Sequence, residues 1–291
     1  MTEPFLGSSS AIPRTTLRGP GYEQLSRDVY VLTSSAVTLR TRVQGALAVF
    51  PNAVPCLSTS GLLLKLPVDD DGIVHLDRGP NASRSRRQGV KVHRFGIPEA
   101  RLHDLDGMKV ADGPRCFADL SAHLDLEALV ALGDVVARRW KADEILAAVT
   151  DHGRRPGAAL LGQAVPLLDR RADSPAESRA RLRLHAAGFT GMRHGVVVRD
   201  ELGGWLSEPD LADETARVAL QHEGEIHFLK GARQRRHDVD RDELTRQQDY
   251  EVVVTTAIDD AQPHRMISRV EAAYRRAATR WGSHVLPAHM R

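Results

Sequence analysis

Four polar residues near the end of the chain have types and spacing that suit a metal-dependent hydrolytic site. Asp210 closes one extended run, and Gln221 and Glu223 lie at the end of the next. Because alternate residues of a strand share a face, Gln221 and Glu223 should point the same way. If the two strands are neighbours, Asp210 joins them, and their oxygen atoms suit Mg²⁺ or Mn²⁺. His227 lies just beyond and could orient or deprotonate the attacking water. Each residue taken singly also fits a turn or surface position.

A further carboxylate, Glu177, lies at the start of a predicted helix. The run Ser174-Pro175-Ala176-Glu177 is typical of a capping box with proline in the first turn. In that interpretation Glu177 accepts a hydrogen bond from the Ser174 amide and does no chemistry. Capping alone accounts for the spacing.

Together these motifs resemble those of the PD-(D/E)XK nuclease superfamily, in particular the actinobacterial branch related to very-short-patch-repair endonucleases. The similar features include the helix start at Ser174, Pro209-Asp210, Gly224-x-x-His227, the charged segment with Asp238, Arg241 and Asp242, and the strand Tyr250 to Thr256. The resemblance implies a restriction-endonuclease-like αβββαβα core that hydrolyses DNA phosphodiester bonds, in repair or defence. It also implies that Glu177, Asp210 and Glu223 bind the metal.

Two positions depart from the family pattern. Relatives carry Glu where this chain has Gln221, which keeps the shape and one carbonyl oxygen but removes a negative charge. The nuclease lysine is missing from its usual slot, and Lys230 is the nearest cation that could replace it. The alternative function is therefore a catalytically degenerate DNA-binding or regulatory protein, or an antitoxin-like partner of another protein.

The elements that must position these residues follow from the hydrophobic pattern. A strand is expected over residues 250–256, and a final helix from Pro263 to Arg280. The inner face of that helix should carry Met266, Val270, Ala273 and Ala277. We expect an α/β protein with a boundary near Asp173, which gives a DNA- or partner-binding region over 1–172 and a nuclease domain over 173–291.

The first part of the chain should form a smaller α+β region. Residues 7–32 predict a short helix, a turn, a second short segment and a strand from Asp28 to Val31. This order fits a winged-helix unit and resembles the N-terminal domain of antitoxins from type IV (abortive infection) toxin–antitoxin systems. A docking helix and edge strand without DNA contact fits it equally. Helices are expected over 36–50 and 58–66, and a long helical stretch from Pro114.

Arginines in this region are the candidate DNA contacts. Arg14 and Arg18 flank the first turn. Arg84, Arg86 and Arg87 lie in the loop GPNASRSRRQG, which is expected to be the tip of a hairpin between strands 73–76 and 90–93. Arginine offers bidentate donors to phosphate oxygens. A solvated basic loop is the alternative.

Composition excludes some classes of protein but does not identify the binding partner. The chain of 291 residues has 40 basic and 38 acidic residues, so only local clustering of arginine could bind nucleic acid. Cys56 and Cys116 form no CxxC pair, which disfavours a thiolate zinc site and a disulfide scaffold. The chain starts with no signal-peptide pattern, and no apolar run approaches the roughly 20 residues that span a bilayer. We expect a cytoplasmic protein that binds DNA, with a possible protein partner or homodimer and no membrane association.

Overall fold

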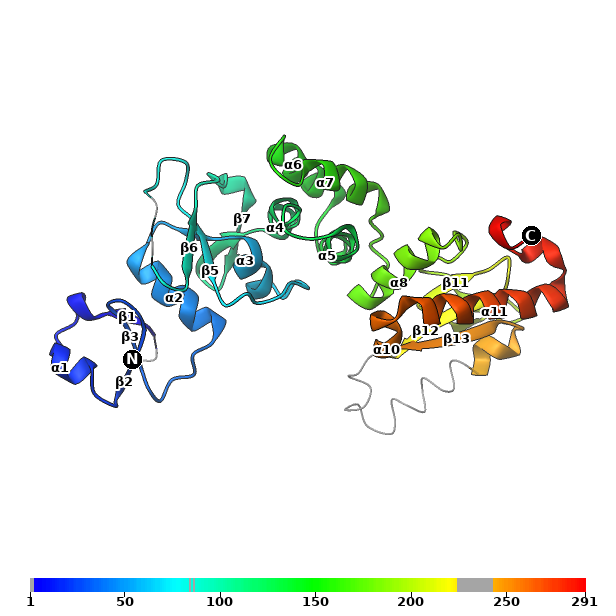
Figure 1. Ribbon diagram of the computed structural model, residues 1–291, viewed down its shortest axis with the longest axis horizontal. Coiled ribbons are helices and arrows are strands. Elements are labelled where there is room, and N and C mark those ends of the chain that lie inside the picture. Colours follow the sequence, from blue (N-terminus) through cyan, green and yellow to red (C-terminus); the bar gives the residue numbers. More distant parts are fainter. Residues whose placement is uncertain (1–2, 84, 86, 224–242) are drawn as a thin grey trace. The chain divides into compact units, whose positions relative to one another are not determined.

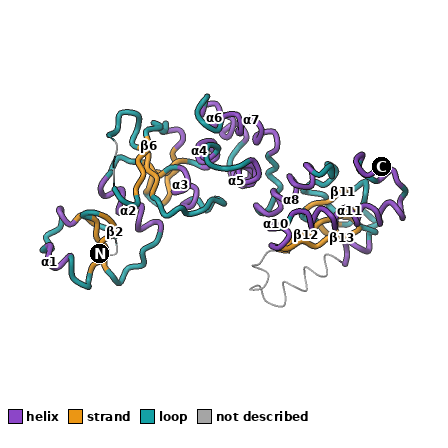
Figure 2. The backbone as a smooth tube through the Cα atoms, in the orientation of Figure 1, coloured by secondary structure: helices purple, strands orange, loops and turns teal. Residues whose placement is uncertain are grey.

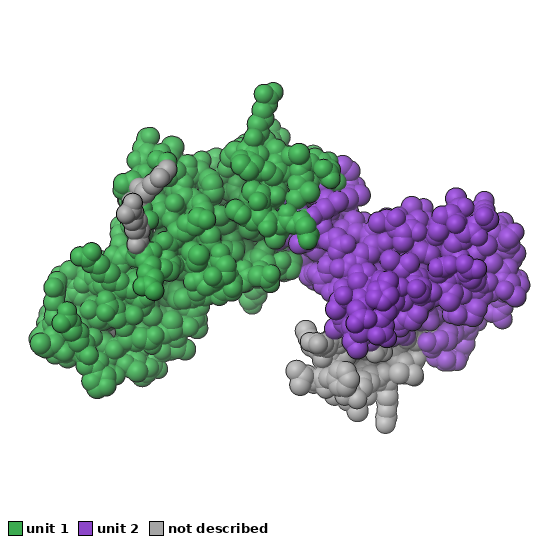
Figure 3. Space-filling view, viewed as in Figure 1, with its two compact units in different colours: residues 1–125, 139–163 green, residues 126–138, 164–291 purple. Residues whose placement is uncertain are grey.

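The computed structural model describes residues 3–83, 85, 87–223 and 243–291, and the side chain of Glu223 lies outside this description. The chain forms two compact units, coloured separately in Figure 3. Unit 1 comprises residues 1–125 and 139–163, and unit 2 comprises residues 126–138 and 164–291. Each unit combines helices with small sheets (Figure 2), so the predicted α/β class is confirmed.

Unit 1 begins with a three-stranded antiparallel sheet of order β1-β3-β2. Its elements are β1 (Phe5–Leu6), η1 (Gly7–Ser9), α1 (Arg14–Leu17), β2 (Tyr22–Ser26) and β3 (Val29–Leu32). The predicted short helix and following strand are therefore present. The segment between them is a strand that pairs with β3, and Asp28 makes the tight turn with a left-handed φ of 65°.

The rest of unit 1 packs helices around a second sheet, of order β4-β5-β6. Its elements are α2 (Leu39–Val49), β4 (Val54–Pro55), α3 (Leu57–Leu63), β5 (Val74–Asp77), β6 (Val90–His93), η2 (Glu99–Arg101), β7 (Leu102–Leu105), β8 (Met108–Ala111), α4 (Gly113–Leu120), α6 (Ala142–His152) and α7 (Ala158–Ala164). Thr38 caps α2 by accepting from the Thr41 amide.

Two expectations for residues 1–172 are wrong. Strands β5 and β6 are parallel, with Val74 opposite Val90, so the two strands do not form the expected hairpin. A connection of about a dozen residues is long enough to return the chain for parallel pairing. The long helix expected from Pro114 is broken as well. It ends at α4, where the Ser121 hydroxyl donates to the Ala118 carbonyl, and α5 (Leu126–Arg139) starts after a turn.

Unit 2 is organised around a mixed sheet of order β11-β12-β13. Its elements are η3 (Val165–Leu167), α8 (Pro175–Ala186), β9 (Val198–Arg199), β10 (Trp205–Ser207), β11 (Leu211–Asp213), β12 (Val218–Glu223), β13 (Glu251–Thr256), α10 (Ala257–Ala261), α11 (Pro263–Trp281), η5 (Ser283–Val285) and η6 (Ala288–Met290). Strand β11 runs antiparallel to β12, and β13 runs parallel to it. The strand and final helix predicted at the end of the chain are confirmed.

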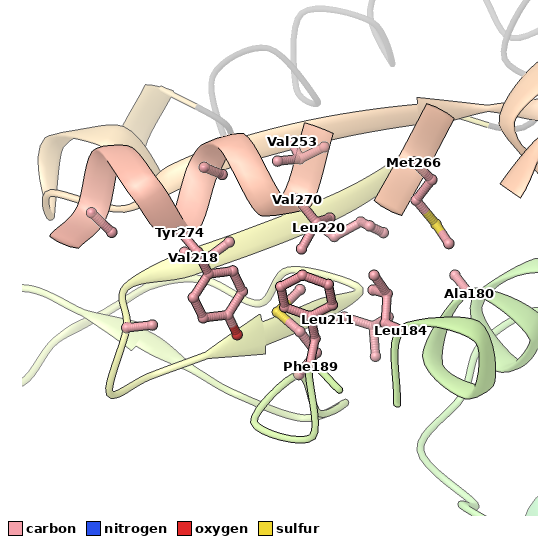
Figure 4. Packing of buried hydrophobic residues seen from close by; sticks show 14 of the residues in the cluster. Ala180, Leu184, Phe189, Leu211, Val218, Leu220, Val253, Met266, Val270 and Tyr274 are labelled. Atoms are coloured by element: carbon pink, nitrogen blue, oxygen red, sulfur yellow. The ribbon is translucent and has the colours of Figure 1, made fainter. Parts of the chain in front are cut away.

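The main core of unit 2 lies between this sheet and helices α8 and α11 (Figure 4). From α11 it receives Met266, Val270, Ala273 and Ala277, the face predicted from sequence, and also Tyr274, whose ring lies 5.1 Å from that of Phe189. The sheet contributes Leu211, Val218, Leu220 and Val253. Because side chains alternate along a strand, Ala219 and Gln221 point to the opposite face, where Val196 and Ala212 form a smaller cluster with Ala219.

No helix within the described ranges is both long and apolar enough to span a membrane.

Candidate functional site

Asp210 and Gln221 meet at one edge of the unit 2 sheet. The sequence predicted that Asp210 ends a strand, but it lies just before the start of β11. Because β11 is antiparallel to β12, with Leu211 opposite Leu220, the start of β11 and the end of β12 share that edge. The two residues therefore come together through an antiparallel hairpin rather than through two strand ends.

The Asp210 carboxylate is held by two donors from β12. The Gln221 Nε2 atom donates to its Oδ1 at 2.9 Å, and the His222 amide donates to its Oδ2 at 2.6 Å. A carboxylate only accepts hydrogen bonds, so the Gln221 amide must direct its nitrogen toward Asp210 in this state. The buried Gln221 side chain thus fixes the orientation of the carboxylate.

Glu177 joins the site from the first turn of α8. Its Oε1 accepts from the Ser174 hydroxyl at 2.8 Å, and its Oε2 accepts from the Asp173 amide at 2.9 Å. The Ser174 hydroxyl in turn accepts from the Glu177 amide. The bond from the Ser174 backbone that the sequence predicted acts on Glu177, and the carboxylate also accepts from the amide one residue further back, at Asp173. Capping therefore holds Glu177 in place and leaves its carboxylate beside the site.

Electrostatics couple Glu177 to Asp210. Only 7% of Glu177 is exposed, and burial together with the nearby negative charge of Asp210 raises the pKa of Glu177 to about 7. The hydrogen bonds from Ser174 and the charge of Arg138 oppose this rise in pKa. A buried carboxylate whose pKa is raised by burial and by a nearby like charge is a pattern common at functional sites.

His194 is a site residue that the sequence did not reveal. Its Nδ1 lies 2.7 Å from the Asp210 carbonyl oxygen and 4.0 Å from Glu177 Oε2. Backbone pairing between Arg193 and Ala212 sets His194 beside β11. Burial lowers the pKa of His194 to about 4, so the ring is neutral. No spacing in the sequence marks this histidine, because its contacts depend on a single tertiary bridge.

The remaining predicted residues either belong to unit 1 or have side chains that lie outside the described residues. The side chain of Glu223 and the whole of His227 lie outside the described residues, as do Lys230, Asp238, Arg241, Asp242, Arg84 and Arg86. Arg14 and Arg18 are exposed beside α1. Arg87 is partly buried, donates to the Ser26 hydroxyl at 3.0 Å and also bonds the Arg27 carbonyl, so it ties its loop to the β2–β3 turn.

The donor set at this sheet edge suits a hard cation. Glu177 and Asp210 offer carboxylate oxygens, and Gln221 offers an amide oxygen if its side chain turns over. The part of the chain that the structure describes contains no group of three histidine, cysteine or acidic residues arranged to hold a metal. A cation here would therefore be bound by two carboxylates and one neutral oxygen from the described residues.

No protein-family model matches this chain, and no curated protein matches it significantly.

Proposed function

We propose that unit 2 is a divalent-metal-dependent phosphodiesterase that acts on DNA, with a core of the PD-(D/E)XK nuclease type. The order α8, β11, β12, β13, α11 and the mixed pairing of the sheet support this proposal. The observation that carries it is the buried Glu177 near the half-buried Asp210, because burial and then the negative charge of Asp210 raise the pKa of Glu177 to about 7. A bound cation relieves that repulsion.

In this proposal Asp210 and Glu177 hold Mg²⁺ or Mn²⁺, which when bound polarises a phosphodiester and lowers the pKa of a coordinated water. The His222 amide keeps the Asp210 carboxylate directed at the sheet edge. Ser174 and the Asp173 amide keep Glu177 in position. With its pKa at about 7, Glu177 is partly protonated at neutral pH, and it would have to be ionised to hold the cation. Glu223 and His227 are proposed as the further ligand and the water-orienting base.

The test pairs two charge-neutralising variants of the same hairpin. Asp210→Asn removes a proposed ligand, and Glu214→Gln neutralises an exposed carboxylate in the turn at the other end of β11. Mn²⁺ binding is measured by calorimetry, and cleavage of supercoiled and linear DNA is measured with Mg²⁺ or Mn²⁺ against a chelator. We expect Asp210→Asn to lose both, by at least a hundredfold in rate, whereas Glu214→Gln keeps both. Equal behaviour of the two variants contradicts the assignment.

A second function is favoured by one contact. The Gln221 Nε2 atom donates a hydrogen bond to Asp210 Oδ1. The amide group therefore already occupies a carboxylate oxygen that a cation would bind. This arrangement suits a nuclease-like core that no longer cuts and instead binds DNA or regulates a partner, including an antitoxin-like role. A comparison of metal affinity between the wild-type protein and Gln221→Glu distinguishes the two functions.

A further inference from the structure

We propose that His194 is a positioning residue of this site, which holds the Asp210 main chain and thereby sets where the Asp210 carboxylate lies relative to Glu177. The proposal rests on the proposed metal site for its functional meaning. Its structural part, the positioning of Asp210, does not require a metal.

The first argument is the geometry of the His194 ring. A carbonyl oxygen only accepts hydrogen bonds, so the 2.7 Å contact requires that Nδ1 carries the proton and donates to Asp210. The same Nδ1 lies 4.0 Å from Glu177 Oε2. The ring therefore bonds the residue that precedes β11 and lies close to the carboxylate on α8 without bonding it.

The second argument is that Asp210 is held from two sides. Its carboxylate accepts from Gln221 and the His222 amide, both on β12. Its carbonyl accepts from His194, which belongs to the segment paired with β11 at Ala212. Asp210 precedes β11 and is not part of its ladder. These contacts therefore hold Asp210 in place, as strand pairing holds the residues of β11. Without the His194 bond, the main chain at this bend would lose one of its anchors.

The third argument is the cost of keeping a histidine here. The residue is 1% exposed, and among the described residues its Nε2 has no hydrogen-bond partner. A buried polar atom without a partner is destabilising, and a leucine of similar size would avoid that cost. The Nδ1 bond to Asp210 explains why a polar ring occupies this position. A neutral histidine donates this hydrogen bond without placing a positive charge next to an incoming cation. An arginine or a lysine would place a positive charge there.

Three variants of the full-length protein test the inference. His194→Leu removes both ring nitrogens, His194→Asn keeps a donor close to the Nδ1 position, and His194→Gln places one close to the Nε2 position. The first readout needs no metal: NMR hydrogen exchange of the His222 amide, which donates to the Asp210 carboxylate. The second is Mn²⁺ affinity by calorimetry.

We expect His194→Leu to accelerate exchange of the His222 amide while the amides of Val218 to Leu220 on the same strand stay protected. Mn²⁺ affinity should fall by about tenfold, the size expected when one buried hydrogen bond is lost. His194→Asn should restore both readouts toward wild type, and His194→Gln should not.

Several results would overturn the inference. One is a folded His194→Leu protein with unchanged His222 exchange. Another is faster exchange along all of β12, which indicates a general packing role. A third is rescue by His194→Gln but not by His194→Asn, which would assign the role to Nε2. If the wild-type protein binds no metal, the proposed function fails, but the exchange comparison among the variants still decides whether His194 positions Asp210.

Discussion

Each unit of this protein buries a cluster of ionisable side chains, and the two clusters differ in how their charges are balanced. In unit 1, Asp119 lies between Arg115, whose Nε is 2.5 Å away, and Arg155, at 3.2 Å, with His152 at 3.4 Å. In unit 2, burial and then the like charge of Asp210 raise the pKa of Glu177 to about 7. A carboxylate matched by arginines stabilises its surroundings, whereas two close carboxylates cost stability until a cation joins them.

The difference suggests separate roles for the two clusters. The Asp119 cluster joins α4 to α6 and the turn after it, within the packed helices of unit 1. Its one carboxylate is paired with two arginines, although the buried Arg115 Nη2 and His152 Nδ1 atoms have no hydrogen-bond partner among the described residues. The Glu177 cluster lies at a sheet edge beside a chain bend. Local rules are commonly broken at functional sites, and a buried carboxylate near a second carboxylate is such a break.

The largest expected effect comes from breaking the balanced cluster. Asp119→Ala leaves Arg115, only 2% exposed, without its close carboxylate partner, and should destabilise the protein by about 3–5 kcal/mol. Thermal and urea unfolding measure the loss. The matched control is Arg40→Ala, which removes the exposed ion pair with Asp106 and should cost at most about 1 kcal/mol. The substitution is made at Arg40 because Asp106 has a left-handed φ of 52° that alanine adopts poorly. Similar losses in the two variants would mean that the buried pair is not a structural element.

The pH dependence of stability sharpens the comparison from the unit 2 side. The folded pKa of Glu177 is raised from its usual 4.5 to about 7, so the folded state holds this proton more tightly than the unfolded state. Its contribution to stability is fully present below about pH 4.5 and is lost as the pH rises through 7. The loss amounts to about 3 kcal/mol at most.

A difference curve isolates this effect, because His194 acts in the opposite direction. Its pKa is lowered to about 4, so its contribution grows as the pH rises from about 4 to 6.5. Glu177→Gln removes only the glutamate titration. We therefore expect the stability of wild type relative to Glu177→Gln to fall between pH 4.5 and 7 in metal-free buffer. A flat difference curve would show that burial and the charge of Asp210 do not raise the pKa of Glu177 in the folded state.

What the sequence revealed depended on how local each interaction is. The inner face of α11 was predictable because Met266, Val270 and Ala273 recur at helical spacing and need no partner to be identified. The cap at Ser174 was predictable for the same reason. The pairing direction of β5 and β6 was not, because a loop of that length permits both a hairpin and a crossover.

The site shows the same limit. Asp210 and Gln221 were expected to converge, yet the reason was wrong, since Asp210 precedes a strand whose antiparallel register brings it opposite Gln221. His194 was missed because its role arises from the Arg193–Ala212 bridge, a contact between segments that no periodic pattern connects. Residue type and order therefore indicated the candidate carboxylates, and tertiary pairing determined what lies beside them.

Gln221→Glu tests whether the unit 2 cluster can be made more dependent on a cation. The change replaces the amide that donates to Asp210 with a third negative charge of the same shape. The metal-free variant should be less stable by about 1–2 kcal/mol, because a hydrogen bond is lost and like charges are added. Mn²⁺ should bind it more tightly and reverse the loss. Calorimetry and thermal unfolding with and without Mn²⁺ measure both effects. Negligible metal binding in wild type and variant alike would favour the non-catalytic function.

The smallest expected effect extends the comparison to DNA, for which unit 1 supplies the proposed arginine contacts and unit 2 the proposed chemistry. Arg14 and Arg18 are exposed and one helical turn apart, so both could reach one phosphate backbone. Arg87 instead bonds the β2–β3 turn within unit 1.

Each phosphate contact releases counterions and adds about 0.9 to the slope of log affinity against log salt concentration. In the full-length protein, the double variant of Arg14→Ala and Arg18→Ala should therefore lower that slope by about two and leave Mn²⁺ binding unchanged. Arg87→Ala should lower thermal stability and leave the slope nearly as it was. Fluorescence anisotropy with a labelled duplex, titrated at several salt concentrations, measures the slope. If the double variant keeps the wild-type slope, these two arginines do not contact DNA.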